Sequence, residues 1–342
     1  MLAVVSLDFD PSTSLFGLSL RLETLGLAGA ILLVLVFAAL SAGRTNLVAT
    51  ANGVAGAIEP KLRRDDLILI AFGAVPGAVI GGRLGYALVH FDYYSANPRA
   101  ITDPGQGGFS LTLAVVLGTL TAITVARLLG APIGRWLGVA AIPALLGLGL
   151  GKLAMVLGGT GQGSYSAASW ATSYVGPGPW GSANPGFPAV PSQAIEGGLD
   201  LALAVLVLVL PFLLRLMDRP WRSPAGPGPA SKRQWAFLAG GRRFLTVLGL
   251  WAVVRFAAAF TWRDARVVGP LVAEQVVLLL VAVVALFGPP AVGAIRRVRA
   301  ASAAGRAARR SARAENAAEA AADRLADETS NSDATAADSA AP

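Results

Sequence analysis

The sequence predicts an all-α integral membrane protein, a helical bundle with about seven transmembrane helices. Two observations lead to this prediction. Hydrophobic residues make up 54% of the chain, charged residues only 14%, and the mean hydropathy is +0.61, whereas soluble globular domains carry about a quarter charged residues. The apolar residues also fall in runs of roughly 17–22, the length that a helix needs to cross a ~30 Å hydrocarbon layer.

Seven apolar runs are long enough to span a membrane, and each ends where charged, Gly-rich or Pro-rich sequence begins. In chain order the runs are Leu25–Ala42, Leu67–Phe91, Phe109–Val125, Leu137–Gly158, Ile195–Leu214, Phe244–Phe260 and Pro270–Phe287. We therefore predict a transmembrane domain over residues 1–290 and a separate tail over residues 291–342.

Lys and Arg in the connections predict the orientation, because cytoplasmic loops of membrane proteins are enriched in basic residues. One set of connections holds 20 of them: Arg44, Lys61, Arg63 and Arg64, then Arg127 and Arg135, then seven from Arg215 to Arg243, then seven from Arg296 to Arg313. The alternate set holds Arg21, Arg99, Arg263 and Arg266. The N-terminus is therefore predicted outside and the C-terminus in the cytoplasm. We interpret the net charge of +8 as this topology signal and as a contact for anionic lipid headgroups, not for nucleic acid.

The residue types that are absent from the chain limit the chemistry that it can perform. The sequence has no cysteine, which excludes disulfides, thiolate nucleophiles, iron–sulfur clusters and Cys-ligated zinc. It has one histidine, His90, and therefore no imidazole cluster for a metal. We expect neither a metal nor another cofactor.

The tail from Arg296 onward differs from the rest of the chain. It is Ala-rich, basic up to Arg313 and then acidic from Glu315 to Asp338, with no apolar stripe. Such a segment cannot bury enough surface to offset the entropy of ordering it. We predict a disordered cytoplasmic tail of low complexity.

The connection Gly159–Ala194 is long, uncharged and rich in Gly, Ser and Pro. Its large aromatic residues are Tyr165, Trp170, Tyr174, Trp180 and Phe187. Aromatic side chains beside a span are commonly interfacial anchors, whereas long irregular loops are often lids over a functional site. Both interpretations stay open.

Three basic residues lie inside predicted spans, where a charge is costly and usually has a functional cause. They are Arg83, Lys152 and Arg255. At 1.5 Å rise per residue they lie about 12, 9 and 10 Å from the outer ends of their helices. Three helices thus place a cation at similar depth. Arg83 and Lys152 each sit in a glycine cluster, which lets neighbouring helices approach closely.

These cations have two interpretations. In the first they are structural: they pair with Glu196, Asp200 or Glu274, or extend along apolar surface to the membrane interface. In the second they line a pocket for an anionic headgroup, since phosphate is a natural ligand of Lys and Arg. An unrelated transporter or channel is a third possibility. Ion-coupled transport usually places acids at mid-membrane, however, and here the residues are basic.

Short motifs along the chain resemble, in order and spacing, those of a known enzyme family. The family motif G-x-R-x-G-Y is matched by Gly81-Gly82-Arg83-Leu84-Gly85-Tyr86, and the start of G-G-M-S-F-H-G-G by Gly107-Gly108-Phe109-Ser110. The Gly-rich segment around Lys152 sits where the family has G-R-x-G-N-F-x-N-x-E. Further along, H-P-S-Q-L-Y-E is resembled by Pro191-Ser192-Gln193-Ala194-Ile195-Glu196, and M-G-Q by Glu274-Gln275. The family is that of the bacterial prolipoprotein diacylglyceryl transferases. The resemblance covers about residues 22–286, and seven spans with an external N-terminus also agree with it.

The resemblance implies a role in lipoprotein biosynthesis at the bacterial plasma membrane. These enzymes transfer the diacylglyceryl group of phosphatidylglycerol to the lipobox cysteine of a prolipoprotein, whose thiol displaces glycerol phosphate to form a thioether. The implied phosphate-binding residues are Arg83, Lys152 and Arg255. The implied rim of the site is formed by Ser192, Gln193 and Glu196. The implied partners are phosphatidylglycerol or another anionic lipid, and the signal peptides of prolipoproteins.

Several positions depart from the family motifs. The family histidine aligns with Thr112, the signature arginine with Lys152, the signature asparagines with Met155 and Gly158, the signature glutamate with Thr160, and the histidine before Pro-Ser-Gln with Val190. A threonine is no base near neutral pH, so the catalytic residue is unknown. His90, at the outer end of the second span, is interpreted as an interfacial histidine. Two functions therefore stay open: an active transferase, and a non-catalytic paralogue that binds anionic lipid or lipoprotein precursor.

Overall fold

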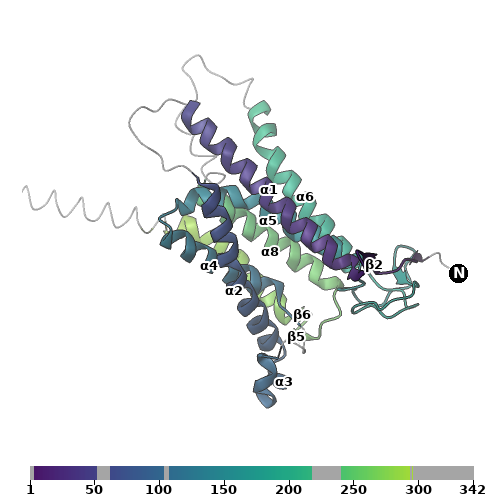
Figure 1. Cartoon of the computed structure of the whole chain (residues 1–342). Helices are drawn as coiled ribbons and strands as arrows, with labels where there is room; N and C mark the ends of the chain where they lie inside the picture. Colours follow the sequence, from purple (N-terminus) through teal and green to yellow (C-terminus); the bar gives the residue numbers. More distant parts are fainter. Residues whose placement is uncertain (1–3, 52–61, 104–107, 218–239, 293–294, 296–342) are drawn as a thin grey trace, which may run out of the picture. The chain divides into compact units, whose positions relative to one another are not determined.

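The computed structural model describes residues 4–51, 62–103, 108–217, 240–292 and 295 (Figure 1). Residues 1–286, so far as they are described, belong to one compact unit, whose boundary follows Leu286. The predicted disordered tail lies outside the described residues from Arg296 onward.

Seven helices in the described part of the chain are long and apolar enough to cross a membrane, which confirms the predicted fold class. They are α1 (Leu22–Ala51), α2 (Arg64–Val89), α4 (Leu111–Leu128), α5 (Ile133–Val156), α6 (Ser192–Met217), α8 (Gly240–Ala258) and a final helix, Ala273–Val292. Each contains most of a predicted apolar run, and the observed ends differ from the predicted ones by a few residues in most cases.

Short elements lie between the spans. They are α3 (Phe91–Ala96), the 3-10 turns η1 (Pro98–Ile101) and η5 (Ala259–Thr261), and the strands β1 (Val5–Leu7), β2 (Ser12–Leu15), β3 (Leu18–Arg21), β4 (Thr172–Tyr174), β5 (Arg266–Val268) and β6 (Leu271–Val272). Strand β1 pairs in parallel with β4, while β2–β3 and β5–β6 are antiparallel. These small sheets have no counterpart in the sequence prediction.

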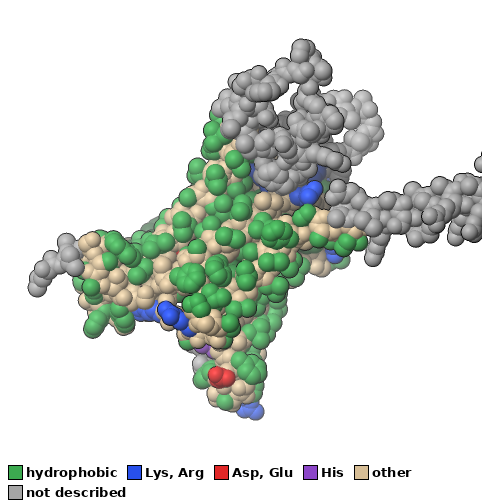
Figure 2. Space-filling view, turned by 180° about the vertical axis from the view of Figure 1, so that it is seen from behind, with side chains coloured by type: hydrophobic (Ala, Val, Ile, Leu, Met, Phe, Trp, Pro, Cys, Tyr) green, Lys and Arg blue, Asp and Glu red, His purple; other side chains and the backbone are tan. Residues whose placement is uncertain are grey.

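The outer surface of the spans is apolar. Leu32, Phe72 and Leu280 are 64%, 72% and 63% exposed on three different helices. In Figure 2 hydrophobic side chains cover the flank of the described bundle. Because water would penalise so much apolar surface, it suits a surrounding of lipid.

Helix α5 is the centre of the bundle and packs against α1, α6 and α8. The buried core around it includes Leu145 of α5, Trp251 of α8 and Leu278 of the final helix. Gly149 of α5 faces Gly197 of α6, where a Cβ on either residue would lie 2.8–3.0 Å from the other's carbonyl oxygen. This close approach lets side chains beside the two glycines meet across the interface.

Helix α2 packs most extensively against α4. A glycine at every fourth position of α2 forms the contact: Gly73, Gly77, Gly81 and Gly85. A Cβ atom at Gly77 or Gly81 would overlap backbone oxygens of α4. Small residues at this spacing line one face of a helix and let two backbones approach closely.

The loop between α5 and α6 is folded. Its strand β4 pairs with the N-terminal strand β1, and Tyr174 and Trp180 are buried with Phe9. Tyr165 and Phe187, by contrast, are 57% and 60% exposed. The loop aromatics that the sequence groups together thus divide into a small core and an exposed set, and the folded loop lies at the same end of the bundle as the site described next.

Candidate functional site

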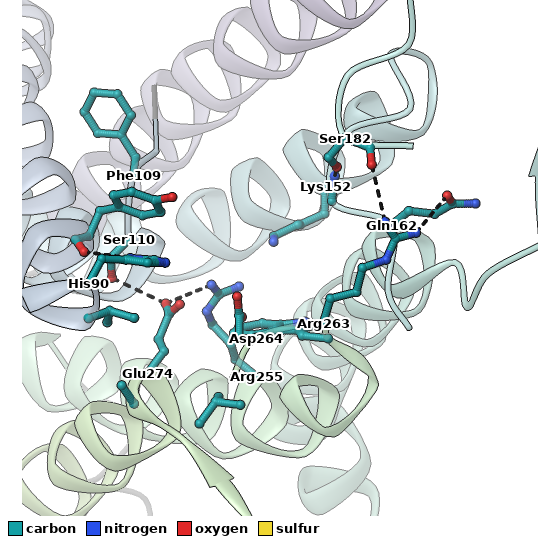
Figure 3. A pocket seen from close by; sticks show the side chains of 16 residues that line it. His90, Phe109, Ser110, Lys152, Gln162, Ser182, Arg255, Arg263, Asp264 and Glu274 are labelled. Carbon is teal, nitrogen blue, oxygen red and sulfur yellow. Dashed lines mark hydrogen bonds and ion pairs between the residues drawn. The ribbon is translucent and has the colours of Figure 1, made fainter. Parts of the chain in front are cut away.

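A cavity of about 320 Å³ opens at the end of the bundle that carries the folded loop (Figure 3). Its wall combines the end of α2, the residues before α4, Lys152 of α5, Arg255 of α8, the segment after η5 and the start of the final helix. Lys152 and Arg255, two of the three cations predicted from the sequence, therefore meet in one site.

Buried carboxylates connect these two cations. Lys152 Nζ lies 3.0 Å from Glu196 Oε2, and Arg255 pairs with Glu196 Oε1 through Nη1. Arg255 Nη2 lies 2.9 Å from Glu274 Oε1, and Figure 3 shows Arg255 and Glu274 facing each other. Glu196 thus bridges the two cations, and charges that would be costly alone in the membrane compensate one another.

Two glycines and a glutamine explain why these charges meet. Gly149 precedes Lys152 by one helical turn, and its partner Gly197 follows Glu196, so the close approach of α5 and α6 brings Lys152 and Glu196 together. On the other side, Gln275 Nε2 donates to Phe256 O at 3.0 Å. This bond joins the final helix to α8 beside the neighbouring pair of Glu274 and Arg255.

The Trp262 ring packs against both cations. Arg255 Cζ lies 4.4 Å and Lys152 Nζ 5.8 Å from its centroid. An aromatic face attracts a cation, and the attraction is stronger where water is excluded. Arg255 is 3% exposed, so ion pairs and the Trp262 ring together fix the position of its guanidinium.

Thr112, where the family motif has histidine, is completely buried and bonded to the same network. Its Oγ1 donates to Glu274 Oε1 at 2.6 Å, and its backbone N–H donates to the same oxygen at 3.2 Å. Thr160, at the signature glutamate position, donates from Oγ1 to Glu23 Oε2 at 2.9 Å. At both positions a threonine hydroxyl therefore binds a carboxylate supplied by a different helix.

The expected rim residues hold the first turn of α6. Ser192 Oγ donates to Thr261 O at 3.1 Å, and Gln193 Nε2 donates to Tyr174 Oη at 3.2 Å. Tyr174 Oη donates in turn to Val156 O at 2.9 Å, and burial raises the pKa of Tyr174 to about 12. Ser192 and Gln193 are buried outside the cavity lining, so they fix the place of Glu196 rather than form an open edge.

Arg83 lies apart from the other two cations and is not among the residues that line the cavity. Its guanidinium donates to the carbonyl oxygens of Ala100, Ile101, Asp103 and Gly108. The expectation that all three cations face one cavity therefore does not hold in this structure. The reason is helical phase: Arg83 lies two residues from both Gly81 and Gly85, about 200° around α2 from the face that contacts α4.

Three ionisable residues that line the cavity belong to none of the sequence motifs. Arg263 donates to Gln162 Oε1 and Ser182 O, each at 3.4 Å, and lies 4.7 Å from the Tyr165 ring. It joins the folded loop to the segment after α8. Loss of solvation and the charge of Glu274 raise the pKa of Asp264, which also lines the cavity.

His90 is the third of these residues. It ends α2 and precedes α3, and it lines the cavity together with Lys152 and Arg255. Its spacing of four residues from Tyr86 would have indicated a stacked pair, but nothing in the sequence indicates that this pair faces the cations.

Within the described ranges, no group of three or more His, Cys, Asp or Glu side chains is suited to hold a metal ion. Asp200, one turn beyond Glu196, is buried and forms no ion pair with the residues that the structure describes. Of the acids expected to neutralise the cations, Glu196 and Glu274 do so.

Comparisons with known proteins agree with the motifs. The family model described as prolipoprotein diacylglyceryl transferase matches residues 17–288. The phosphatidylglycerol–prolipoprotein diacylglyceryl transferase of Agrobacterium fabrum is 32% identical over 158 residues, which is 46% of this chain and 53% of that protein. The Brucella anthropi protein of the same name is 30% identical over 197 residues, 57% of this chain and 62% of that protein.

A third relative of that name, from Brucella ovis, is 30% identical over 164 residues, 47% of this chain and 56% of its own. The chain therefore spans between half and two thirds of the length of these curated relatives. The family model, in contrast, extends from before the first span into the last one. This multi-pass membrane protein belongs to the prolipoprotein diacylglyceryl transferase family.

Proposed function

We propose that this protein transfers the diacylglyceryl group of phosphatidylglycerol to the lipobox cysteine of prolipoproteins in a bacterial plasma membrane. Its family and the names of its relatives support this function. The observation that carries the proposal is the network of Lys152, Glu196, Arg255 and Glu274 beside one cavity between the spans. Such a network suits a ligand that combines an anionic headgroup with lipid chains.

Lys152 is the side chain best suited to receive the lipid phosphate. An ammonium group has three N–H donors, and within the described part of the chain Lys152 forms one ion pair, with Glu196. The side chain lines the cavity and is 13% exposed. Two donors are therefore available to phosphate oxygens, in a place where each charge-assisted hydrogen bond contributes ~1.5–3 kcal/mol.

Arg255 contributes fixed positive charge beside the same ligand. Its guanidinium is held by Glu196, Glu274 and the Trp262 ring. A charge that is already in position stabilises a departing phosphate without the cost of reorganising the site. Arg263 supplies a further cation from the segment after η5.

The remaining predicted residues act by positioning. Ser192 and Gln193 fix the first turn of α6, and thereby Glu196, between the two cations. Arg83 holds the segment that leads into α4 through its bond to Gly108 O. Ser110 and Thr112 follow directly in that segment, so we assign Arg83 to the support of the site rather than to phosphate contact.

A second function is favoured by one observation, the Thr112 side chain. Where the family motif has histidine, this chain has a hydroxyl that donates to Glu274, and a threonine cannot accept a thiol proton near neutral pH. A non-catalytic paralogue that binds anionic lipid or lipoprotein precursor would need the cations but not the base.

Purified full-length protein in phosphatidylglycerol nanodiscs separates these two functions. We expect it to add a diacylglyceryl group to a lipobox peptide, detected by mass spectrometry, and to restore lipoprotein modification in cells depleted of their own transferase. Lys152→Met should weaken phosphatidylglycerol binding by roughly 10- to 150-fold, the equivalent of a charge-assisted hydrogen bond.

The matched control is Ser95→Ala. Ser95 lies in α3, and its hydroxyl donates to Asp92 O outside the cavity, so its loss should change neither binding nor transfer. A wild-type protein that binds the lipid but leaves the peptide cysteine free would favour the non-catalytic function. Lipid binding that is unaffected by Lys152→Met would contradict the phosphate site.

A further inference from the structure

The chain's single histidine lies in the cavity that holds the predicted phosphate site. His90 connects α2 to α3 and lines the cavity together with Lys152, Arg255 and Glu274. Figure 3 shows its ring beside Ser110, on the wall opposite Lys152. The interpretation of His90 as an interfacial histidine therefore does not explain why the residue lines this cavity.

Hydrogen bonding defines which ring nitrogen of His90 is basic. Nδ1 lies 3.0 Å from the carbonyl oxygen of Tyr86. A carbonyl oxygen can only accept, so in the neutral ring the proton sits on Nδ1 and the lone pair on Nε2. The same carbonyl accepts the backbone N–H of His90 at 3.1 Å, which ties the ring to the end of α2.

Aromatic stacking fixes the plane of the ring. The Tyr86 and His90 rings are 4.1 Å apart between centroids and inclined by 31°. With Nδ1 bonded to the helix end, the ring is held at the cavity wall, which Ser110 also lines (Figure 3). A ring whose Nε2 carries the lone pair thereby lies at the cavity where a headgroup and a thiol would meet.

Other groups in the cavity are less suited to accept a proton. Glu274 Oε1 already receives bonds from Arg255 and Thr112, and Lys152 is paired with Glu196. Asp264 and Glu274, both lining the cavity, would instead stabilise the positive charge that a protonated ring acquires.

We propose that Nε2 of His90 is the general base that deprotonates the lipobox thiol, in place of the base absent at Thr112. This inference rests on the proposed transferase function. The thiol proton passes to Nε2, and the sulfur electron pair forms a C–S bond to the glyceryl carbon of phosphatidylglycerol. The bond from that carbon to the phosphate oxygen breaks, and its electron pair leaves on glycerol phosphate, which takes up a proton from the imidazolium directly or through water.

His90→Asn is the sharpest test. An asparagine side chain retains an N–H near the Nδ1 position, for the bond to Tyr86 O, but has no basic nitrogen. We expect transfer to the lipobox peptide in phosphatidylglycerol nanodiscs to fall by about 10²–10⁴-fold, the usual contribution of a general base. Phosphatidylglycerol binding should stay within a few-fold of wild type, and Ser95→Ala should match wild type in both assays.

A second variant separates the loss of a base from a structural effect of the substitution. His90→Ala opens the space of the ring, and added imidazole should restore part of the transfer activity if the ring acts as a base. No restoration by imidazole would overturn the assignment. Undiminished transfer by His90→Asn would also overturn it while leaving the transferase function intact. Wild-type protein that forms no thioether would defeat both proposals together.

Discussion

Two intramembrane arginines, Arg83 and Arg255, give the same signal in the sequence but occupy different environments. Arg255 is bonded to the carboxylates of Glu196 and Glu274 beside the cavity. Arg83 donates to four backbone carbonyl oxygens around η1 and before α4. A cation in an apolar run thus indicates that the side chain has a polar partner. Whether the residue belongs to a site or supports one depends on that partner, which is a pair of carboxylates for Arg255 and a set of backbone carbonyl oxygens for Arg83.

The largest expected effect is that of Arg255→Ala. The substitution removes the cation that pairs with Glu274 and with Oε1 of Glu196, while Lys152 still pairs with Oε2 of Glu196. Breaking a buried ion pair costs ~3–5 kcal/mol. We expect the free energy of unfolding in detergent to fall by that order and phosphatidylglycerol binding to be lost. An Arg255→Ala protein as stable as wild type would contradict the network.

Arg83→Ala should have a smaller and different effect. Removing its side chain takes a charged donor from four loop carbonyl oxygens that are part-buried or exposed, and a charge-assisted bond contributes at most ~1.5–3 kcal/mol. We expect lower stability and faster proteolysis near residues 97–103, with phosphatidylglycerol affinity within a few-fold of wild type. If Arg83→Ala abolishes lipid binding while the fold is retained, the distinction between the two arginines fails and Arg83 becomes a phosphate ligand.

Much of this comparison follows from the sequence, and part of it does not. Apolar run length predicts the seven helices, because a span must satisfy its own backbone hydrogen bonds. The glycines beside Lys152 and Arg83 indicate close helix contacts, which the structure has. The helical phase of Arg83 relative to Gly81 and Gly85 is also in the sequence. The place of its carbonyl partners is not, because nothing local specifies where residues 97–103 and Gly108 lie.

The parts that could not be predicted depend on long-range pairing. Strands β1 and β4 are separated by more than 150 positions and are three residues long, too short for a periodic pattern. His90 follows an apolar run and carries no motif. Its proposed role depends on the turn into α3 and on cavity residues of α8 and the final helix. The orientation of the N-terminus stays a prediction from basic residues, which a reporter fused within Gly159–Ala194 would test.

Thr112→Val tests the same network of Arg255 and Glu274 with a smaller expected loss of stability. Valine keeps the shape and the backbone N–H bond but removes the hydroxyl bond to Glu274. Losing one such bond to a charged group costs ~1.5–3 kcal/mol, so stability should fall less than in Arg255→Ala. Transfer activity should fall through misplacement of Glu274, measured by the same peptide assay. No change in either quantity would mean that Thr112 does not position Glu274.

The smallest effect is expected at Asp264, at the edge of the Arg255 region. Loss of solvation and the charge of Glu274 raise the pKa of Asp264 above its ordinary 3.8. A raised pKa in the folded state means that the stability contributed by the protonated carboxyl is complete below pH 3.8 and is lost as the pH rises through the folded pKa. Asp264→Asn should therefore equal wild type in the acid range and exceed it slightly at neutral pH, by no more than ~0.5 kcal/mol for an exposed position.

Thermal unfolding of both proteins across this pH range measures the difference. The same substitution in a Ser95→Ala background should give the same increment, because the Ser95 hydroxyl is bonded to Asp92 O outside the cavity and independent sites add. An Arg255→Ala background should change it, since the cation that opposes the raised pKa of Asp264 is then missing. Equal increments in the two backgrounds would mean that Asp264 is not coupled to the Arg255 network. The charge of Arg255 would then have no measurable effect on the pKa of this residue of the cavity wall.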